Sequence, residues 1–153
     1  MDQIATRSYR SEDFNACLAI FDGNVPTFFS QDERVEFAQF LDDLGSSTSS
    51  YLVITLHGRI VACGGLSIGP TPTIASLSWG MVDPAHHRQG LGTRLTYERL
   101  KLARSSAEIA EVVLATSQHT SRFYERHGFR VVETTPNGFA AGLDRYDMTL
   151  RLV

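Results

Sequence analysis

Residues 77–104, LSWGMVDPAHHRQGLGTRLTYERLKLAR, form the stretch of sequence that decides the fold. Residues 75–82 are mostly apolar or small and predict a strand, which Pro84 ends because proline has no N–H to donate. Gly90-Leu91-Gly92-Thr93 follows, and a helical pattern of leucines begins there. The stretch therefore predicts a strand, then a loop, then a helix that begins at the glycines. The expected apolar face contains Leu91, Leu95 and Leu102, and the charges expected on its other faces are Arg94, Glu98, Arg99 and Lys101.

A helix that begins at glycines is suited to bind an anion. Its first N–H groups have no partner within the helix, and the helix dipole adds about half a positive charge at that end. Gly90 and Gly92 let the backbone approach a bulky anion, and Thr93 adds a hydroxyl donor. The dinucleotide fingerprint would need a third glycine where Leu95 stands, and the Walker loop would need Gly-Lys-Ser/Thr, which the sequence lacks. The alternative is a plain helix entry in which the glycines only make a turn.

Two motifs in the sequence belong together. The first is Val82-Asp83-Pro84 followed by Arg88-Gln89-Gly90-Leu91-Gly92. The second is Phe123-Tyr124-Glu-Arg-His-Gly128-Phe129, at the end of a helix expected over 120–127. They resemble the two motifs of the GNAT superfamily of acyl-CoA-dependent N-acyltransferases, Gln/Arg-x-x-Gly-x-Gly/Ala, with His87 here at the first position, and F-Y-x-x-x-G-F. The resemblance covers nearly the whole chain. It implies acetyl-CoA as the cofactor, its pyrophosphate held by the glycine loop, with a weaker contact from the His87 ring.

The resemblance also implies the architecture and the cofactor cleft. The fold class expected is α/β (α+β), the GNAT fold, with a mixed, mostly antiparallel central sheet of about six to seven strands and helices on both faces. Strands expected over 76–82 and 109–116 should pair parallel through a right-handed crossover and then splay apart, so that pantetheine bonds to main chain between them. The implied cofactor-binding residues are Met81, Val82, His87, Arg88, Gln89, Gly90, Leu91, Gly92, Thr93, Ser117 and Tyr124.

Acetyl transfer to an amine needs a neutral amine, a donor for the carbonyl oxygen as it gains charge, and a proton for the departing thiolate. Tyr124 matches the family's tyrosine, which implies that it supplies this proton. The alternative is a half-buried core tyrosine beside Phe123. The oxygen would be held by an N–H at Met81 or Val82.

The general base stays open at the level of sequence. Many family members carry a carboxylate on the strand before the loop, but residues 74–82 contain none. Asp83 is expected to accept a backbone N–H instead, close to Pro84. The proton of the acceptor amine must therefore be taken by water or by a residue of another segment. The residues considered are Asp144, Glu36 and His119.

The acceptor is expected to be a primary amine of a small molecule or a peptide. Residues 22–30 form a loop rich in turn residues yet apolar, and the resemblance places this loop beside the acceptor pocket. A second loop, expected over 136–144, is a candidate acceptor wall or lid, or else mere slack. Trp79 could hold a cationic amine by its face. The candidate substrate-binding residues are Asn24, Phe28, Phe29, Trp79, Asp144 and Tyr146.

The other helices and strands are predicted from N-cap residues and from the alternation of apolar and polar residues. A strand over 4–9 leads to a helix capped by Ser11, and a second helix is capped by Ser30 with Glu33 completing a capping box. Two strands, 51–56 and 59–66, are joined by a hairpin turn at His57-Gly58. The last two strands are expected over 130–134 and 145–152.

Composition agrees with a single N-acetyltransferase domain over residues 1–153. The chain has 153 residues, 42% of them hydrophobic, and no linker-like segment divides it. A net charge of −3 argues against nucleic acid as a partner, because phosphate backbones require a basic face. No apolar run is long enough to span a membrane, and Met1-Asp2-Gln3 does not begin a signal peptide, so we expect a cytoplasmic protein, monomer or homodimer, that contacts no membrane.

Cysteines and histidines do not form a metal-binding pattern. Cys17 and Cys63 lie among apolar neighbours and are interpreted as buried free thiols, and no metal site is expected from the spacing of the five histidines. Besides the enzyme, two other functions remain open at this level. One is a non-catalytic acyl-CoA-binding sensor or interaction module of the same fold, and the other is a phosphate-binding α/β domain unrelated to coenzyme A.

Overall fold

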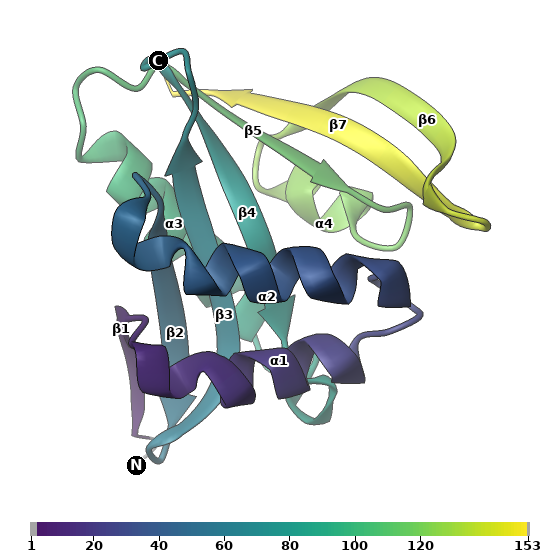
Figure 1. Cartoon of the computed structure of the whole chain (residues 1–153). Coiled ribbons are helices and arrows are strands. Elements are labelled where there is room, and N and C mark those ends of the chain that lie inside the picture. Colours follow the sequence, from purple (N-terminus) through teal and green to yellow (C-terminus); the bar gives the residue numbers. More distant parts are fainter. Residues whose placement is uncertain (1–2, 153) are drawn as a thin grey trace.

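Seven strands in the order β1-β2-β3-β4-β5-β7-β6 form one sheet in the computed structural model, which describes residues 3–152 (Figure 1). Each neighbouring pair is antiparallel except β4 and β5, which run parallel. This confirms the predicted mixed, mostly antiparallel sheet. The strands are β1 (Ile4–Ser8), β2 (Ser50–Leu56), β3 (Arg59–Ile68), β4 (Ile74–Val82), β5 (Glu111–Thr116), β6 (Arg130–Ala140) and β7 (Leu143–Arg151).

Helices cover both faces of the sheet, as predicted (Figure 1). The helices α1 (Phe14–Gly23) and α2 (Arg34–Asp42) contact each other and lie across one face. The helix α3 (Leu91–Arg104) packs on the opposite face against β2, β3 and β4. The short α4 (Ser121–Arg126) lies beside β6, near the end of the sheet that carries the C-terminal hairpin.

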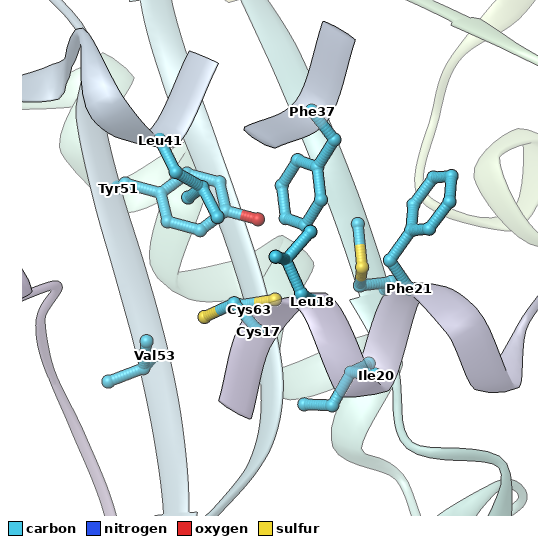
Figure 2. Close-up of a cluster of buried hydrophobic side chains, with 10 residues drawn as sticks. Cys17, Leu18, Ile20, Phe21, Phe37, Leu41, Tyr51, Val53 and Cys63 are labelled. Carbon is cyan, nitrogen blue, oxygen red and sulfur yellow. The ribbon is translucent and has the colours of Figure 1, made fainter. Parts of the chain in front are cut away.

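An apolar core fills the space between the sheet and the pair α1/α2 (Figure 2). Phe21 and Phe37 stack at 5.5 Å between ring centroids, and both are fully buried. Cys17 and Cys63 lie together in this core as buried free thiols, which confirms their prediction. The neighbouring Cys63 thiol and burial hold the pKa of the Cys17 thiol well above its usual range, so this thiol stays protonated.

The helix caps and the hairpin turn between β2 and β3 agree with their predictions, except for the cap at Ser11. The positive φ angles of His57 (53°) and Gly58 (79°) produce the predicted two-residue turn between β2 and β3. The Ser30–Glu33 capping box is present as predicted. The expected cap at Ser11 is wrong: the turn there is closed by Asp13, whose carboxylate accepts the Arg10 N–H at 2.8 Å.

The C-terminal hairpin also differs from its prediction. Residues 136–144 are not a long loop, because β6 continues to Ala140 and β7 begins at Leu143. Pro136 is tolerated within β6 since this strand is at the edge of the sheet and its missing N–H costs no ladder bond there. The register of β6 and β7 shifts between Thr135 and Ala140, and a side chain bridges the two strands there: the Asp144 carboxylate accepts the Asn137 N–H at 2.9 Å.

Candidate active site

The parallel strands β4 and β5 pair only at one end, which opens a cleft between them. Residues Ile74–Ser76 face Glu111–Val113, and beyond this point β5 follows β7 while β4 follows β3 as far as Val82 (Figure 1). Among residues 3–152, the main chain of β4 after Ser76 therefore has one edge without a strand partner. This is the splayed pair that the sequence predicts.

A bulge at Trp79 bends β4 at the cleft. Trp79 and Gly80 together oppose the single residue Gly64 on β3, and Trp79 has a positive φ of 48°. Such a conformation is unfavourable for a bulky residue, so the surroundings must hold it. The buried Tyr51 hydroxyl donates to the Trp79 carbonyl at 2.7 Å, and the Trp79 ring packs against Phe37 at 5.1 Å between centroids.

The cleft continues into a cavity of about 630 Å³, a volume typical of small-ligand sites. Its lining comes from β4, the glycine loop, α3, β5, α4 and the loop after α1, so it joins segments far apart in sequence. Among the described residues, Gln89, Asp144 and Tyr146 do not line it. The other predicted site residues all do: Asn24, Phe28, Phe29, Trp79, Met81, Val82, His87, Arg88, Gly90, Leu91, Gly92, Thr93, Ser117 and Tyr124.

One end of the cavity is the N-terminus of α3. Gly90 is the N-cap residue with a left-handed φ of 79°, which glycine adopts without strain. Within residues 3–152, none of the backbone N–H groups from Arg88 to Thr93 has a hydrogen-bond acceptor. A Cβ placed on Gly90 would meet no atom within 4 Å. The loop thus presents unpaired donors and open space at the positive end of a 14-residue helix.

The Val82 carbonyl joins three segments at the rim of the cavity. The Asn24 side-chain nitrogen donates to it at 3.0 Å, and the His87 Nε2 lies 2.9 Å from it. Because a carbonyl only accepts, His87 is the donor in this pair. The Asn24 nitrogen also donates to the Ile20 carbonyl at 2.8 Å, so this side chain has only its oxygen left for a ligand. Sequence alone did not predict these hydrogen bonds.

Tyr124, on α4, lines the same cavity. The helix ends where expected: Gly128 follows it with a φ of 97°, and the Phe129 N–H bonds back to the Tyr124 carbonyl at 3.1 Å. The Tyr124 ring is held edge-on by Phe123 and Phe129, at 5.1 and 5.8 Å between centroids. Its hydroxyl oxygen accepts a hydrogen bond from the Arg99 Nη2 at 3.3 Å.

Arg99 corrects the expected pattern of α3. It was predicted on a charged face, but it is 1% exposed and lines the cavity. A signal for this was present in the spacing, because Arg99 follows Leu95 by four residues and precedes Leu102 by three. It therefore falls on the apolar face of the helix.

Glu33 is a second residue whose place in the site the sequence did not reveal. It is the one carboxylate among the described residues that line the cavity, and it also closes the capping box by accepting the Ser30 N–H at 2.8 Å. Burial raises the pKa of the Glu33 carboxyl, and the charge of Glu36 adds to this, while the Ser30 N–H acts in the opposite direction. Asp83, as predicted, accepts a backbone N–H, from Ala85 at 3.0 Å.

The residues considered as a base are spread over the molecule. His119 lines the cavity, and Phe28 lies edge-on to it at 6.0 Å between ring centroids. Glu36 and Asp144 are outside the lining, within the part of the chain that the structure describes. From the C-terminal hairpin, Phe139 reaches the cavity.

Among residues 3–152, no group of three or more His, Cys, Asp and Glu side chains could hold a metal ion. No helix there combines the length and the apolar character needed to cross a membrane.

Comparison with known proteins agrees with the resemblance carried by the two motifs. A model of the acetyltransferase (GNAT) family matches residues 17–129, most of the chain. The chain belongs to the GNAT family. An amino-acid acetyltransferase from Mycobacterium tuberculosis is 33% identical to this GNAT chain over 86 residues, which cover 53% of the chain and 44% of that protein. The match therefore spans less than half of that relative.

Solved structures show the same GNAT fold. A protein of the family from Desulfovibrio desulfuricans has a TM-score of 0.83 and 21% identity, and the match covers 98% of this chain and 99% of that one. A protein from Salmonella typhimurium, solved with its cofactor acetyl-CoA, has a TM-score of 0.80 and 19% identity, with 99% and 95% covered. These likenesses confirm the predicted fold class.

Proposed function

We propose that the chain transfers an acetyl group from acetyl-CoA to a primary amine of a small molecule or peptide, by direct attack, with Tyr124 as general acid. One observation carries this proposal: Tyr124 lines the same cavity as Arg88 and Gly90–Thr93, whose backbone N–H groups are unpaired among the described residues. A family membership shared with acetyltransferases supports the reaction class.

The glycine loop fits the pyrophosphate of coenzyme A. Its N–H groups are unpaired, the dipole of α3 favours a negative charge there, and Gly90 leaves space for a bulky group. When bound, acetyl-CoA supplies a thioester carbonyl for an amine to attack. The acetyl-CoA in the Salmonella typhimurium neighbour supports this cofactor.

Val82 is the better of the two candidates for holding the carbonyl oxygen as it gains charge. The Asp83 N–H donates to Val61 on β3 at 2.8 Å. Since successive residues of an extended strand direct their main-chain groups to opposite edges, the Val82 N–H is directed toward the open cleft. The Met81 N–H is directed back toward β3. A fixed backbone donor of this kind is worth about 10²–10³ in kcat in acyl transfer.

Tyr124 and Glu33 divide the proton chemistry. The Tyr124 hydroxyl gives its proton to the departing sulfur, which keeps the thiolate from reversing the reaction. Glu33 attracts the acceptor as an ammonium ion and takes its proton, directly or through water, because it is the cavity carboxylate and burial raises its pKa toward the working pH. Phe28 and Trp79 form the apolar walls on the acceptor side.

A panel of amines tests the function. The purified chain is mixed with acetyl-CoA and each of a set of amino acids, polyamines, aminoglycosides and peptides with free N-termini, and both thiol release and the acetylated product are measured. Amine-dependent thiol release with matching product is expected. Tight binding of acetyl-CoA with no release for any amine would contradict the enzyme and leave an acyl-CoA-binding sensor.

A further inference from the structure

We propose that Arg99 is a positioning residue for Tyr124: its buried guanidinium directs the Tyr124 hydroxyl proton into the cavity and balances the charge left on the phenol oxygen after the proton is given away. This inference rests on the proposed function. It adds a residue to the reaction that neither the motifs nor the comparisons indicate.

The burial of Arg99 is not explained by folding. The side chain is 1% exposed, yet its Nε has no hydrogen-bond partner among residues 3–152, and no carboxylate of these residues forms an ion pair with it. A buried charge with no opposite charge beside it costs free energy, and an apolar residue of similar size would be at least as stable there. A positive charge kept in such a place is therefore explained better by chemistry than by stability.

The sheet leaves space for this guanidinium at the bulge of β4. A Cβ on Gly80 would lie 2.7 Å from the Arg99 Nη2 and 2.8 Å from its Nη1, closer than real side chains approach. A Cβ on Gly64, the residue opposite the bulge, would lie 3.3 Å from the Arg99 Cζ. Glycine at both positions lets the charged group lie against the backbone where β4 and β5 have separated.

The hydrogen bond to Tyr124 fixes the direction of proton donation. A guanidinium has donors only, so in the pair with Arg99 at 3.3 Å the Tyr124 oxygen must accept. The single hydroxyl hydrogen is then free to be donated elsewhere, and the cavity that both residues line is the side open to a ligand. Without Arg99, the hydroxyl could turn and donate to another acceptor.

The same contact balances the charge during the reaction. The amine nitrogen forms a bond to the acetyl carbon, the carbon–sulfur bond breaks with its electron pair on sulfur, and sulfur takes the Tyr124 proton. The proton lost by the amine goes to Glu33 or water. The negative charge left on the Tyr124 oxygen lies beside the buried Arg99 cation, where opposite charges attract more strongly than in bulk water. A proton from solvent then restores the hydroxyl.

A double-mutant cycle tests this inference. Arg99→Met keeps an unbranched side chain and removes the charge, Tyr124→Phe removes the hydroxyl, and kcat is measured for both variants and the double variant with an accepted amine. We expect Arg99→Met to lower kcat by about 10², and to lower it less than about twofold further when Tyr124→Phe is already present. KM for acetyl-CoA should stay within about twofold, and the melting temperature should not fall. Arg104→Met, at the exposed end of the same helix, is the matched control and should leave kcat unchanged.

Two results overturn the inference on its own: an Arg99→Met variant with wild-type kcat, or equal losses from Arg99→Met with and without the Tyr124 hydroxyl. Absence of amine-dependent turnover in the wild-type chain is a different result, which contradicts the proposed function itself. If Arg99→Met does not fold, Gly80→Ala replaces it, because the added methyl group must displace the guanidinium while Arg99 stays in the chain. It should lower kcat about tenfold or more, again only when the Tyr124 hydroxyl is present, and a Gly80→Ala variant with wild-type kcat would overturn the inference.

Discussion

Gly90→Val should abolish tight binding of acetyl-CoA, and Gly142→Val should not. Both glycines have left-handed φ angles, 79° and 78°, and in both cases a Cβ would meet no protein atom within 4 Å. Gly142 is in the β6–β7 turn, outside the cavity, and Gly90 is in its lining. The two substitutions therefore impose the same backbone strain, and only Gly90→Val places a side chain where we expect the unpaired N–H groups to bind the pyrophosphate.

The magnitudes follow from the backbone and the donors. A left-handed conformation costs an L-residue about 1–2 kcal/mol, so each variant should melt about 2–8 °C below the wild type. Loss of even two charged hydrogen bonds to the pyrophosphate costs about 3–6 kcal/mol, which raises the Kd of acetyl-CoA by about 10²–10⁴. Calorimetric titration of both folded variants, well below their melting temperatures, measures this. Unchanged affinity in Gly90→Val, or an equal loss in Gly142→Val, would refute the assignment of the loop.

Three further predictions concern the acceptor, the base and the fold. Phe28→Ala should raise KM for the amine or change which amines react, with the acetyl-CoA Kd unchanged, because Phe28 lines the part of the cavity proposed for the acceptor. Steady-state kinetics with varied amines would contradict this if only the cofactor constant changed. Glu33→Gln should lower kcat/KM for the amine by about 10² or more, whereas the control Glu36→Gln, at an exposed position, should not. In the wild type, kcat/KM should begin to fall at a pH above 4.5 on the acid side, because the raised pKa makes the Glu33 carboxylate take up a proton earlier as pH falls. The Arg7 guanidinium holds the pKa of the buried Asp13 carboxyl below 3.8, so this ion pair stabilises the fold above that pH, and the stabilisation is lost as pH falls through the pKa of the folded state. Arg7→Met should therefore lower the free energy of unfolding in urea by about 2 kcal/mol at pH 7 and by less at pH 3. An equal loss at both pH values would refute the ion pair.

Sequence reasoning reached those parts of the site that depend on local pattern. The glycine loop at the start of α3 and the end of α4 at Gly128 each follow from turn residues and caps over a few positions. The placement of Tyr124 came from a motif at such a helix end. Local signals of this kind survive folding because the residues that carry them are neighbours in the chain.

The features that sequence missed depend on contacts between distant segments or on residues with two roles. The Asn24–Val82 bond joins residues 58 positions apart, and no local pattern announces it. Glu33 was already explained as part of a capping box, so its carboxylate was not considered for the cavity. Arg99 was assigned by its charge, although its spacing from Leu95 placed it on the apolar face. The expected loop at 136–144 became strand because an edge position tolerates Pro136.

The measurement that tests the central claim most directly is kcat and melting temperature on one preparation of Tyr124→Phe, with an amine that the wild type accepts. The substitution keeps the ring contacts with Phe123 and Phe129 and removes a hydroxyl whose bond to Arg99 is long, at 3.3 Å, so the stability should fall by no more than about 1 kcal/mol. General acid catalysis by Tyr124 predicts a fall in kcat of about 10²–10⁴ with a nearly unchanged melting temperature. A lowered melting temperature with near-wild-type kcat would make Tyr124 a core residue and leave the thiolate to take its proton from water.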